Sequence, residues 1–360
     1  MLAEGYSVAH GARIVVLIVC PCMLMQRCRV AFAAMSTWTN VDSCPTQACV
    51  QRLASAIKSN RALSLGEQAQ TIFMKLMDPN LTAFLLSPLA LGVLGLCIGS
   101  FLNVVIHRLP LMLERDWKRE SADILGVKID ELPAMTLSTP RSRCPACAHP
   151  IAWHENIPLV SYLRLRGKCA ACRAPISVRY PALELLTAGL FAACGWRFGA
   201  EPQVLLWCGL VATLIALAFI DFDTQFLPDD LTQPLVWAGI AGAALGWTQI
   251  PLSAAVGGAI TGYLALWSVH HAYRLVRGRE GMGAGDFKLL AALGAWMGWQ
   301  LIPSIILLAS AVGAVIGIGM IVFRGHDKAV PIPFGPYLAG GGVAALFFGE
   351  QLTRLWFPAL

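Results

Sequence analysis

The chain has 360 residues, of which 57% are hydrophobic and 13% charged, and its mean hydropathy is +0.63. Soluble domains carry about 25% charged residues, so this composition excludes a water-soluble globular protein and predicts an integral membrane protein. The net charge of +6 does not indicate a nucleic-acid partner, because Lys and Arg are confined to loops between apolar segments, a pattern typical of membrane topology. We therefore expect a lipid bilayer, and no nucleic acid, as a partner.

Residues 1–80 do not have the pattern of a membrane core. Arg13 precedes an apolar run at 14–25, and the small residues at 31–34 are typical of a signal-peptide cleavage site. Two interpretations stay open: a signal-like segment, or an extension that comes from a misassigned start or was added in this lineage. We treat 1–80 as an unassigned N-terminal extension.

From residue 84 onward, apolar windows approach the ~20 residues that a helix needs to span hydrocarbon. These windows lie at 84–106, 182–198, 203–220, 231–247, 252–272, 287–301, 302–323 and 334–353. They predict an all-α polytopic membrane protein with about eight transmembrane helices. We expect a first span within 81–106, a loop at 107–181 and a transmembrane core at 182–360.

The distribution of Lys and Arg predicts the orientation of these spans. The 107–181 loop carries twelve such residues, and others follow the fifth and seventh spans, whereas the alternate connections near 199–203, 248–251 and 301–303 carry none. Positively charged loops stay in the cytoplasm. The pattern therefore places the long loop in the cytoplasm and both chain ends outside.

The long loop contains two C-x2-C pairs separated by 21 residues: Cys144, Cys147, Cys169 and Cys172. Four thiolates at this spacing form a closed tetrahedral zinc site, which leaves no open position for a catalytic water. The loop has few apolar residues, so a metal would supply folding energy, and a cytoplasmic location argues against disulfides. We predict a zinc-ribbon-like domain with a structural Zn²⁺; oxidised or empty cysteines are the alternative, and His149 and His154 are expected to be solvated or capping residues.

Two acids at the edges of apolar segments are the candidate catalytic residues. Gly281, Gly283 and Gly285 lead into Asp286, and Asp221 ends the apolar run that begins near residue 203. Two carboxylates held close together share one proton, so that one acts as base toward water and the other as acid toward a scissile carbonyl. The alternative is that each acid caps a helix or pairs with a neighbour such as Lys288.

Three other acids compete with Asp221 for the first position. Asp229 and Asp230 suit the first turn of the following helix, where negative charge interacts favourably with the helix dipole. Asp223 lies two residues after Asp221 and is harder to separate from it by pattern alone.

The sequence resembles the type IV prepilin peptidases, a family of GxGD membrane aspartyl proteases. The resemblance covers about 85–350 and rests on the segments 99–110, 144–147, 156–162, 169–172, 176–184, 221–229, 281–288 and 333–337. In that family the first catalytic aspartate stands seven residues before a proline, a spacing that Asp221 has to Pro228 and Asp223 does not. The second is the aspartate of G-x-G-D, which is Asp286 here.

The resemblance implies a multi-pass enzyme of the bacterial inner membrane whose active site faces the cytoplasm. It would cleave the basic leader from type IV prepilins or type II secretion pseudopilins. It would then methylate the new N-terminus with S-adenosylmethionine, for which Asn103, Arg108 and Glu184 are candidate binding residues. The rival class is a transporter or channel with structural or cation-binding acids, which predicts acids near the middle of spans.

Overall fold

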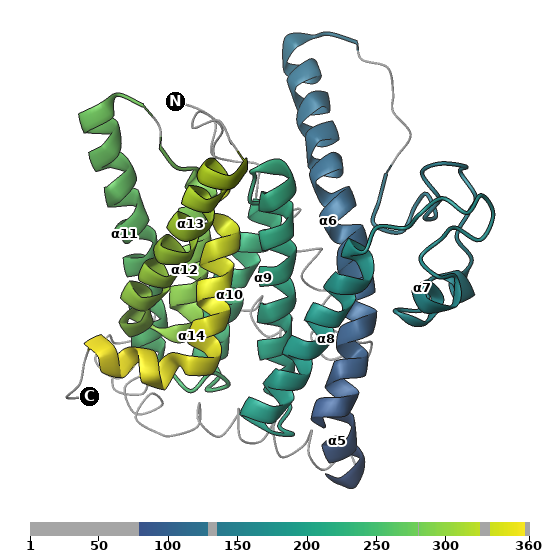
Figure 1. Ribbon diagram of the computed structural model, residues 1–360. Coiled ribbons are helices and arrows are strands. Elements are labelled where there is room, and N and C mark those ends of the chain that lie inside the picture. The colour runs from purple at the N-terminus through teal and green to yellow at the C-terminus, as the bar shows by residue number, and fades with distance from the viewer. Residues whose placement is uncertain (1–78, 129–134, 280, 325–331, 357–360) are drawn as a thin grey trace, which may run out of the picture. The chain divides into compact units, whose positions relative to one another are not determined.

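The computed structural model describes residues 79–128, 135–279, 281–324 and 332–356, so almost all of the predicted 1–80 extension lies outside the described residues. The described chain is helical (Figure 1). Its α-helices are α5 Pro79–Leu85, α6 Pro88–Leu125, α7 Val160–Arg164, α8 Arg179–Phe198, α9 Val204–Thr224, α10 Asp229–Ala244, α11 Leu252–Arg277, α12 Ala284–Met297, α13 Ile302–Arg324 and α14 Gly335–Trp356.

Four helical segments are long and apolar enough to cross a membrane. They are α6, α9, α11 and the segment Trp299–Val322, which contains most of α13. Each of the eight predicted windows coincides with a helix, but α8, α10, α12 and α14 do not reach the same length and hydropathy. The prediction of a helical membrane protein is therefore confirmed, while the count of eight spans stays a prediction.

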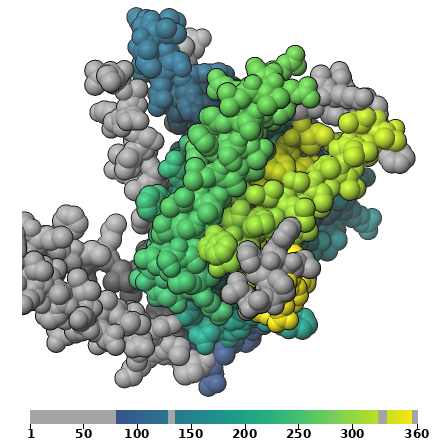
Figure 2. All heavy atoms as spheres, turned by 90° about the vertical axis from the view of Figure 1, so that its left-hand side faces the viewer, coloured from purple at the N-terminus to yellow at the C-terminus, as the bar shows by residue number. Residues whose placement is uncertain are grey.

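Large apolar side chains on the outside of the bundle agree with a lipid environment. Figure 2 looks onto α11 and α13, which cover one face. Ile260 on α11 is 54% exposed and Val315 on α13 is 71% exposed. Water-soluble proteins rarely expose apolar surface along whole helices, whereas lipid chains solvate such a surface.

Helix α6 is longer than the sequence pattern indicated. It has 38 residues and runs through Pro110 to Leu125, so the first part of the predicted 107–181 loop is helical. Exposed charges support this extension: Glu114 accepts a hydrogen bond from Lys118 at 2.6 Å in an i, i+4 pair. Gly126 ends the helix in the left-handed conformation at φ 66°.

Glycines allow the helices of the bundle to pack closely. A Cβ at Gly99 of α6 would lie 2.7 Å from Cα of Glu184 on α8, and a Cβ at Gly262 of α11 would lie 2.5 Å from the carbonyl oxygen of Leu290 on α12. The hydrophobic effect does not drive helix association in lipid. Small residues at such crossings let the backbones approach closely, and the van der Waals contacts made there favour association instead. The closest crossing is that of Gly258 on α11 with Gly294 on α12.

We predict that Gly258→Ala destabilises the bundle, because the added Cβ would collide with the backbone carbonyl of Gly294. Overpacking of this kind costs about 1–3 kcal/mol, measurable as a fall in the free energy of unfolding in detergent micelles. Gly257→Ala is the matched control, since its Cβ would meet nothing closer than Cδ1 of Trp299 at 3.9 Å. Equal stability of the two variants would contradict the packing described here.

Candidate active site and metal site

Asp221 is buried in the last turn of α9. Its side chain is 5% exposed, and its Oδ2 accepts a hydrogen bond of 2.9 Å from the backbone N–H of Gly335. Gly335 is the first residue of α14, so its N–H is one of the donors that a helix start leaves without an intrahelical partner. The Asp221 carboxylate thus supplies an acceptor for an N–H at the start of α14, and that N–H supplies a hydrogen-bond donor to the buried carboxylate.

Asp286 approaches the same place from another helix. It is the third residue of α12, is 8% exposed, and lies within electrostatic range of Asp221. The segment after α9 fills the space beside it: a Cβ at Gly285 would lie 2.7 Å from Cβ of Leu227. The structure therefore brings together the two acids that the sequence analysis selected, at helix ends rather than in mid-helix.

Two of the three competing acids, Asp223 and Asp229, have other partners. Arg179 donates to both carboxylate oxygens of Asp223, at 2.7 and 2.6 Å. Lys288 donates to both oxygens of Asp229 at 2.7 Å, so the alternative pairing of Lys288 with Asp286 is not observed. Asp229 and Asp230 lie in the first turn of α10, as the sequence pattern predicted.

The four cysteines of the long loop form two equivalent knuckles. Cys144 N–H donates to His149 O, and Cys169 N–H donates to Ala174 O, both at 2.9 Å. The residue after each second cysteine has positive φ: 56° at Ala148 and 60° at Arg173. The same backbone turn is therefore used twice, 25 residues apart in the chain.

The thiol sulfurs converge as a metal site requires. All four Sγ atoms lie within 4.8 Å of one another, and Cys144 and Cys172 are 3.8 Å apart. Zinc–sulfur bonds of about 2.3 Å in a tetrahedron place the sulfurs about 3.8 Å apart. The backbone N–H groups of Cys147 and Ala146 lower the pKa of the Cys144 thiol to about 7, whereas the neighbouring Cys172 raises the pKa of Cys147 to about 12, so Cys144 ionises before Cys147. The cluster can hold a metal ion.

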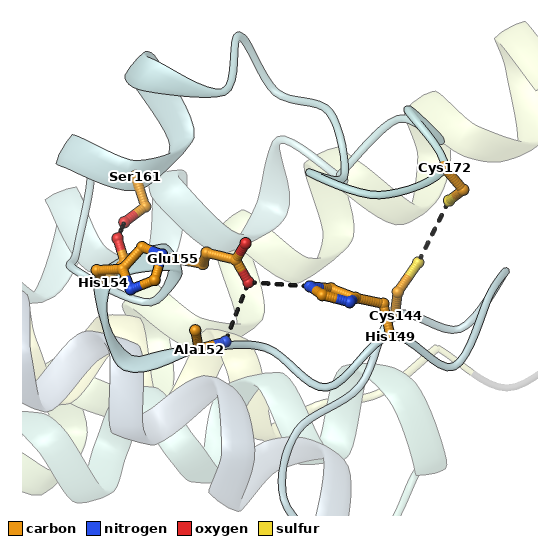
Figure 3. Close-up of polar contacts among 7 residues, drawn as sticks. All are labelled: Cys144, His149, Ala152, His154, Glu155, Ser161 and Cys172. Atoms are coloured by element: carbon orange, nitrogen blue, oxygen red, sulfur yellow. Dashed lines mark hydrogen bonds and ion pairs between the residues drawn. The ribbon is translucent and has the colours of Figure 1, made fainter.

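The two histidines of the loop have roles other than metal binding (Figure 3). His149 Nε2 lies 3.3 Å from Glu155 Oε2, an oxygen that also accepts from Ala152 N–H at 3.0 Å. That backbone N–H, with the nearby His149, lowers the pKa of Glu155. His154 contributes its carbonyl, which accepts from Ser161 Oγ at 2.9 Å. The expectation that His149 and His154 are solvated or capping residues stays a prediction.

Comparison with known proteins identifies the family. Residues 93–198 match the bacterial peptidase A24 N-terminal domain, and residues 208–318 match the type IV leader peptidase family. The chain is 53% identical to a prepilin leader peptidase/N-methyltransferase of Aeromonas hydrophila over 73% of this chain and 91% of that protein. It is 51% identical to a protein of the same name from Pseudomonas aeruginosa, again over 73% and 91%.

The chain belongs to the type IV leader peptidase family. The resemblance inferred from the motifs is thereby confirmed, as is the prediction of an enzyme of the aspartic peptidase class. A Stutzerimonas stutzeri relative of the same name is 49% identical over 78% of this chain and 96% of its own length. No solved structure matches the chain.

The three candidate methyl-donor residues of this leader peptidase hold backbone groups. Asn103 Nδ2 donates to Gly99 O at 3.2 Å, and Arg108 Nη1 donates to Thr136 O at 3.1 Å. Glu184 Oε2 accepts from Leu159 N–H at 2.8 Å. The contacts of Arg108 and Glu184 fasten the loop to α6 and α8, whereas the contact of Asn103 with Gly99 lies within α6. Their assignment to the methyl donor stays a prediction.

Two partners of the acids were not assigned a role from the sequence. The motif at 333–337 does not by itself show that the Gly335 N–H donates to Asp221. The signal in the sequence is the Gly335-Pro336 step at the start of an apolar window, which indicates a helix start with free N–H groups. Arg179 was counted as one of the loop cations and not as the partner of Asp223. Sequence spacing does not show which distant chain segment a side chain will meet.

We predict that the purified chain carries about one metal ion, because four converging thiolates form a closed tetrahedral site. Cys169→Ser should lower the metal content, measured by elemental analysis against protein concentration, to well under half. Cys97→Ser, which changes a cysteine on α6 outside the cluster, should leave it unchanged. A Cys169→Ser protein with undiminished metal, or a wild type without any, would argue against the site.

Proposed function

We propose that this leader peptidase cleaves the basic leader from type IV prepilins or type II secretion pseudopilins with Asp221 and Asp286 as its acid–base pair. The proposal is supported by the burial of both carboxylates and by the electrostatic interaction between them, in a chain whose relatives are named prepilin leader peptidases. Paired carboxylates in a poorly hydrated site perform water-mediated peptide hydrolysis without a covalent intermediate.

The hydrogen bond at Asp221 supports a division of roles. The Gly335 N–H, 2.9 Å from Oδ2, would stabilise negative charge on Asp221, which would take a proton from the attacking water. Asp286 would then be the protonated partner and donate to the scissile carbonyl oxygen. The C–N bond of the gem-diol intermediate then breaks as Asp221 passes its proton to the leaving amine, and a hydroxyl of the diol returns a proton to Asp286 as the new carboxyl group forms, which restores the shared-proton state.

The proposed location is the bacterial inner membrane, with the acid pair on the cytoplasmic side. The end of α6 and the end of α11 point the same way in Figure 1, and α11 carries Arg274 and Arg277 in its last turn. Basic segments stay in the cytoplasm, and a basic leader would stay there for the same reason. The proposal also includes eight transmembrane spans, a cytoplasmic loop at 107–181 and a transmembrane core at 182–360.

We further propose that the enzyme methylates the new N-terminus, because its relatives are named N-methyltransferases. S-adenosylmethionine would supply the methyl group when bound. Because the three candidate residues are engaged with backbone groups, we derive no step through the donor.

We assign Zn²⁺ as the ion of the four-cysteine cluster. The support is the four-thiolate donor set and its spacing, which suit a closed zinc site. Cys144, Cys147, Cys169 and Cys172 would hold the ion, which would stabilise the fold of a loop with little apolar core. It would have no part in peptide hydrolysis.

The rival transporter function has no comparable support. A cation-binding role predicts acids near mid-span or in broken helices, whereas Asp221 lies in the last turn of α9 and Asp286 in the first turn of α12.

We predict that Asp221→Asn and Asp286→Asn each lower leader cleavage by about 10²–10⁴-fold, because each removes one proton-transfer group. Cleavage is followed with a purified prepilin in detergent. Glu350→Gln is the control, because Glu350 pairs with Arg197 at 3.2 Å on the surface. This variant should cleave prepilin at the wild-type rate. If both aspartate variants process prepilin at the wild-type rate, the peptidase mechanism proposed here is wrong.

Gly335→Ala should also impair cleavage, because the new Cβ would lie 2.7 Å from Asp221 Oδ2 and displace the carboxylate from its N–H donor. We expect a fall in kcat of about tenfold or more, since small misplacements of catalytic groups are costly. Gly340→Ala is the matched control on the same helix, where the added Cβ would meet nothing within 4 Å. Equal kcat values for the two variants would remove Gly335 from the site.

A further inference from the structure

An ion pair next to the acid pair joins the two segments that match family models. Arg179 lies in the N-terminal match at 93–198, and Asp223 lies in the peptidase match at 208–318. The guanidinium donates to both oxygens of the carboxylate, at 2.7 and 2.6 Å. Such fork-to-fork contacts fix orientation as well as distance, which a single hydrogen bond between exposed side chains does not do.

Other contacts hold Arg179 in place. Arg179 is the first residue of α8, its N–H donates to Ser177 Oγ at 3.3 Å, and its guanidinium lies 5.0 Å from the ring centroid of Phe219 on α9. The cation therefore contacts α9 at two points one turn apart. The side chains of Arg179 and Asp223 are 37% and 33% exposed, so the strength of the contact comes from its geometry more than from burial.

Asp223 occupies the part of α9 that most needs support. The helix ends at Thr224, and Gln225 follows in the left-handed conformation with its N–H donating to Asp221 O at 2.8 Å. The last turn of a helix frays readily because its carbonyls lack intrahelical partners. Asp221 lies in that same turn, so any fraying would move the proposed catalytic carboxylate.

We propose that Arg179 is a positioning residue for the peptidase reaction: by gripping Asp223 it holds the last turn of α9, and thus Asp221, in place against Gly335 and Asp286. The proposal rests on the proposed function of Asp221. Arg179 does not act on substrate, and its partner is Asp223. The segment at 93–198 would in this way complete the active site of the segment at 208–318.

The test compares Arg179→Gln, Arg179→Lys and Asp223→Asn with wild type in detergent, using a purified prepilin. We expect kcat to fall about 10–100-fold in Arg179→Gln and Asp223→Asn, since a displacement of about 1 Å has that effect, with KM changed less than twofold. Arg179→Lys keeps the positive charge but loses the bidentate geometry, so its kcat should lie between those of wild type and Arg179→Gln. Hydrogen exchange of the amides at 221–225 should be faster in the two neutral variants.

The charge swap Arg179→Asp with Asp223→Arg should recover part of the lost kcat and slow the exchange again, which a general loss of stability would not allow. Arg197→Gln is the matched control: Arg197 lies at the other end of α8 and pairs with Glu350 at 3.2 Å, and its loss should leave kcat and exchange unchanged.

Wild-type kcat and wild-type exchange in Arg179→Gln and Asp223→Asn would overturn the inference. So would equal losses in Arg179→Gln and Arg197→Gln. If Arg179→Gln does not accumulate in the membrane, Asp223→Asn and the charge swap decide by the same two measurements. Failure of the proposed function is a different result, in which Asp221→Asn itself cleaves normally.

Discussion

The burial of two carboxylates at one end of a helical bundle is the constraint on which the rest of the structure depends. An ionised carboxylate removed from water costs several kcal/mol unless polar groups replace the lost hydration. Here the start of α14 supplies a backbone N–H to Asp221. In the proposed pair Asp286, in the first turn of α12, carries the shared proton, so only one negative charge needs such compensation.

This compensation requires the backbone to approach closely. Gly335 lies so near Asp221, and Gly285 so near Leu227, that a Cβ at either position would come within 2.7 Å of its neighbour. Gly285 and Gly335 are thus explained by space at contacts between distant segments, whereas a Cβ at Gly283 would meet nothing within 4 Å. The same requirement recurs away from the acids, where glycines let α11 and α12 pack backbone to backbone.

Helix α12 shows what hydropathy alone does not predict. It has 14 residues and is buried continuously from Phe287 to Met297, apart from partly buried Lys288. Surrounding helices, including α10, α11 and α14, contact it. An apolar residue is equally compatible with lipid and with a protein neighbour, so hydropathy alone predicts that this helix is apolar but not that other helices surround it.

The sequence by itself determined the local features: apolar helices, the two cysteine knuckles, and acids at helix ends, because each follows from periodicity or spacing within a short stretch. It missed the helical extension of α6 to Leu125, since a charged amphipathic segment and a polar loop have similar compositions. Only the tertiary structure decided that Asp223 pairs with Arg179 while Asp221 meets Gly335. These contacts span 44 and 114 residues, and their partners are selected by the packing of whole helices, which no local pattern encodes.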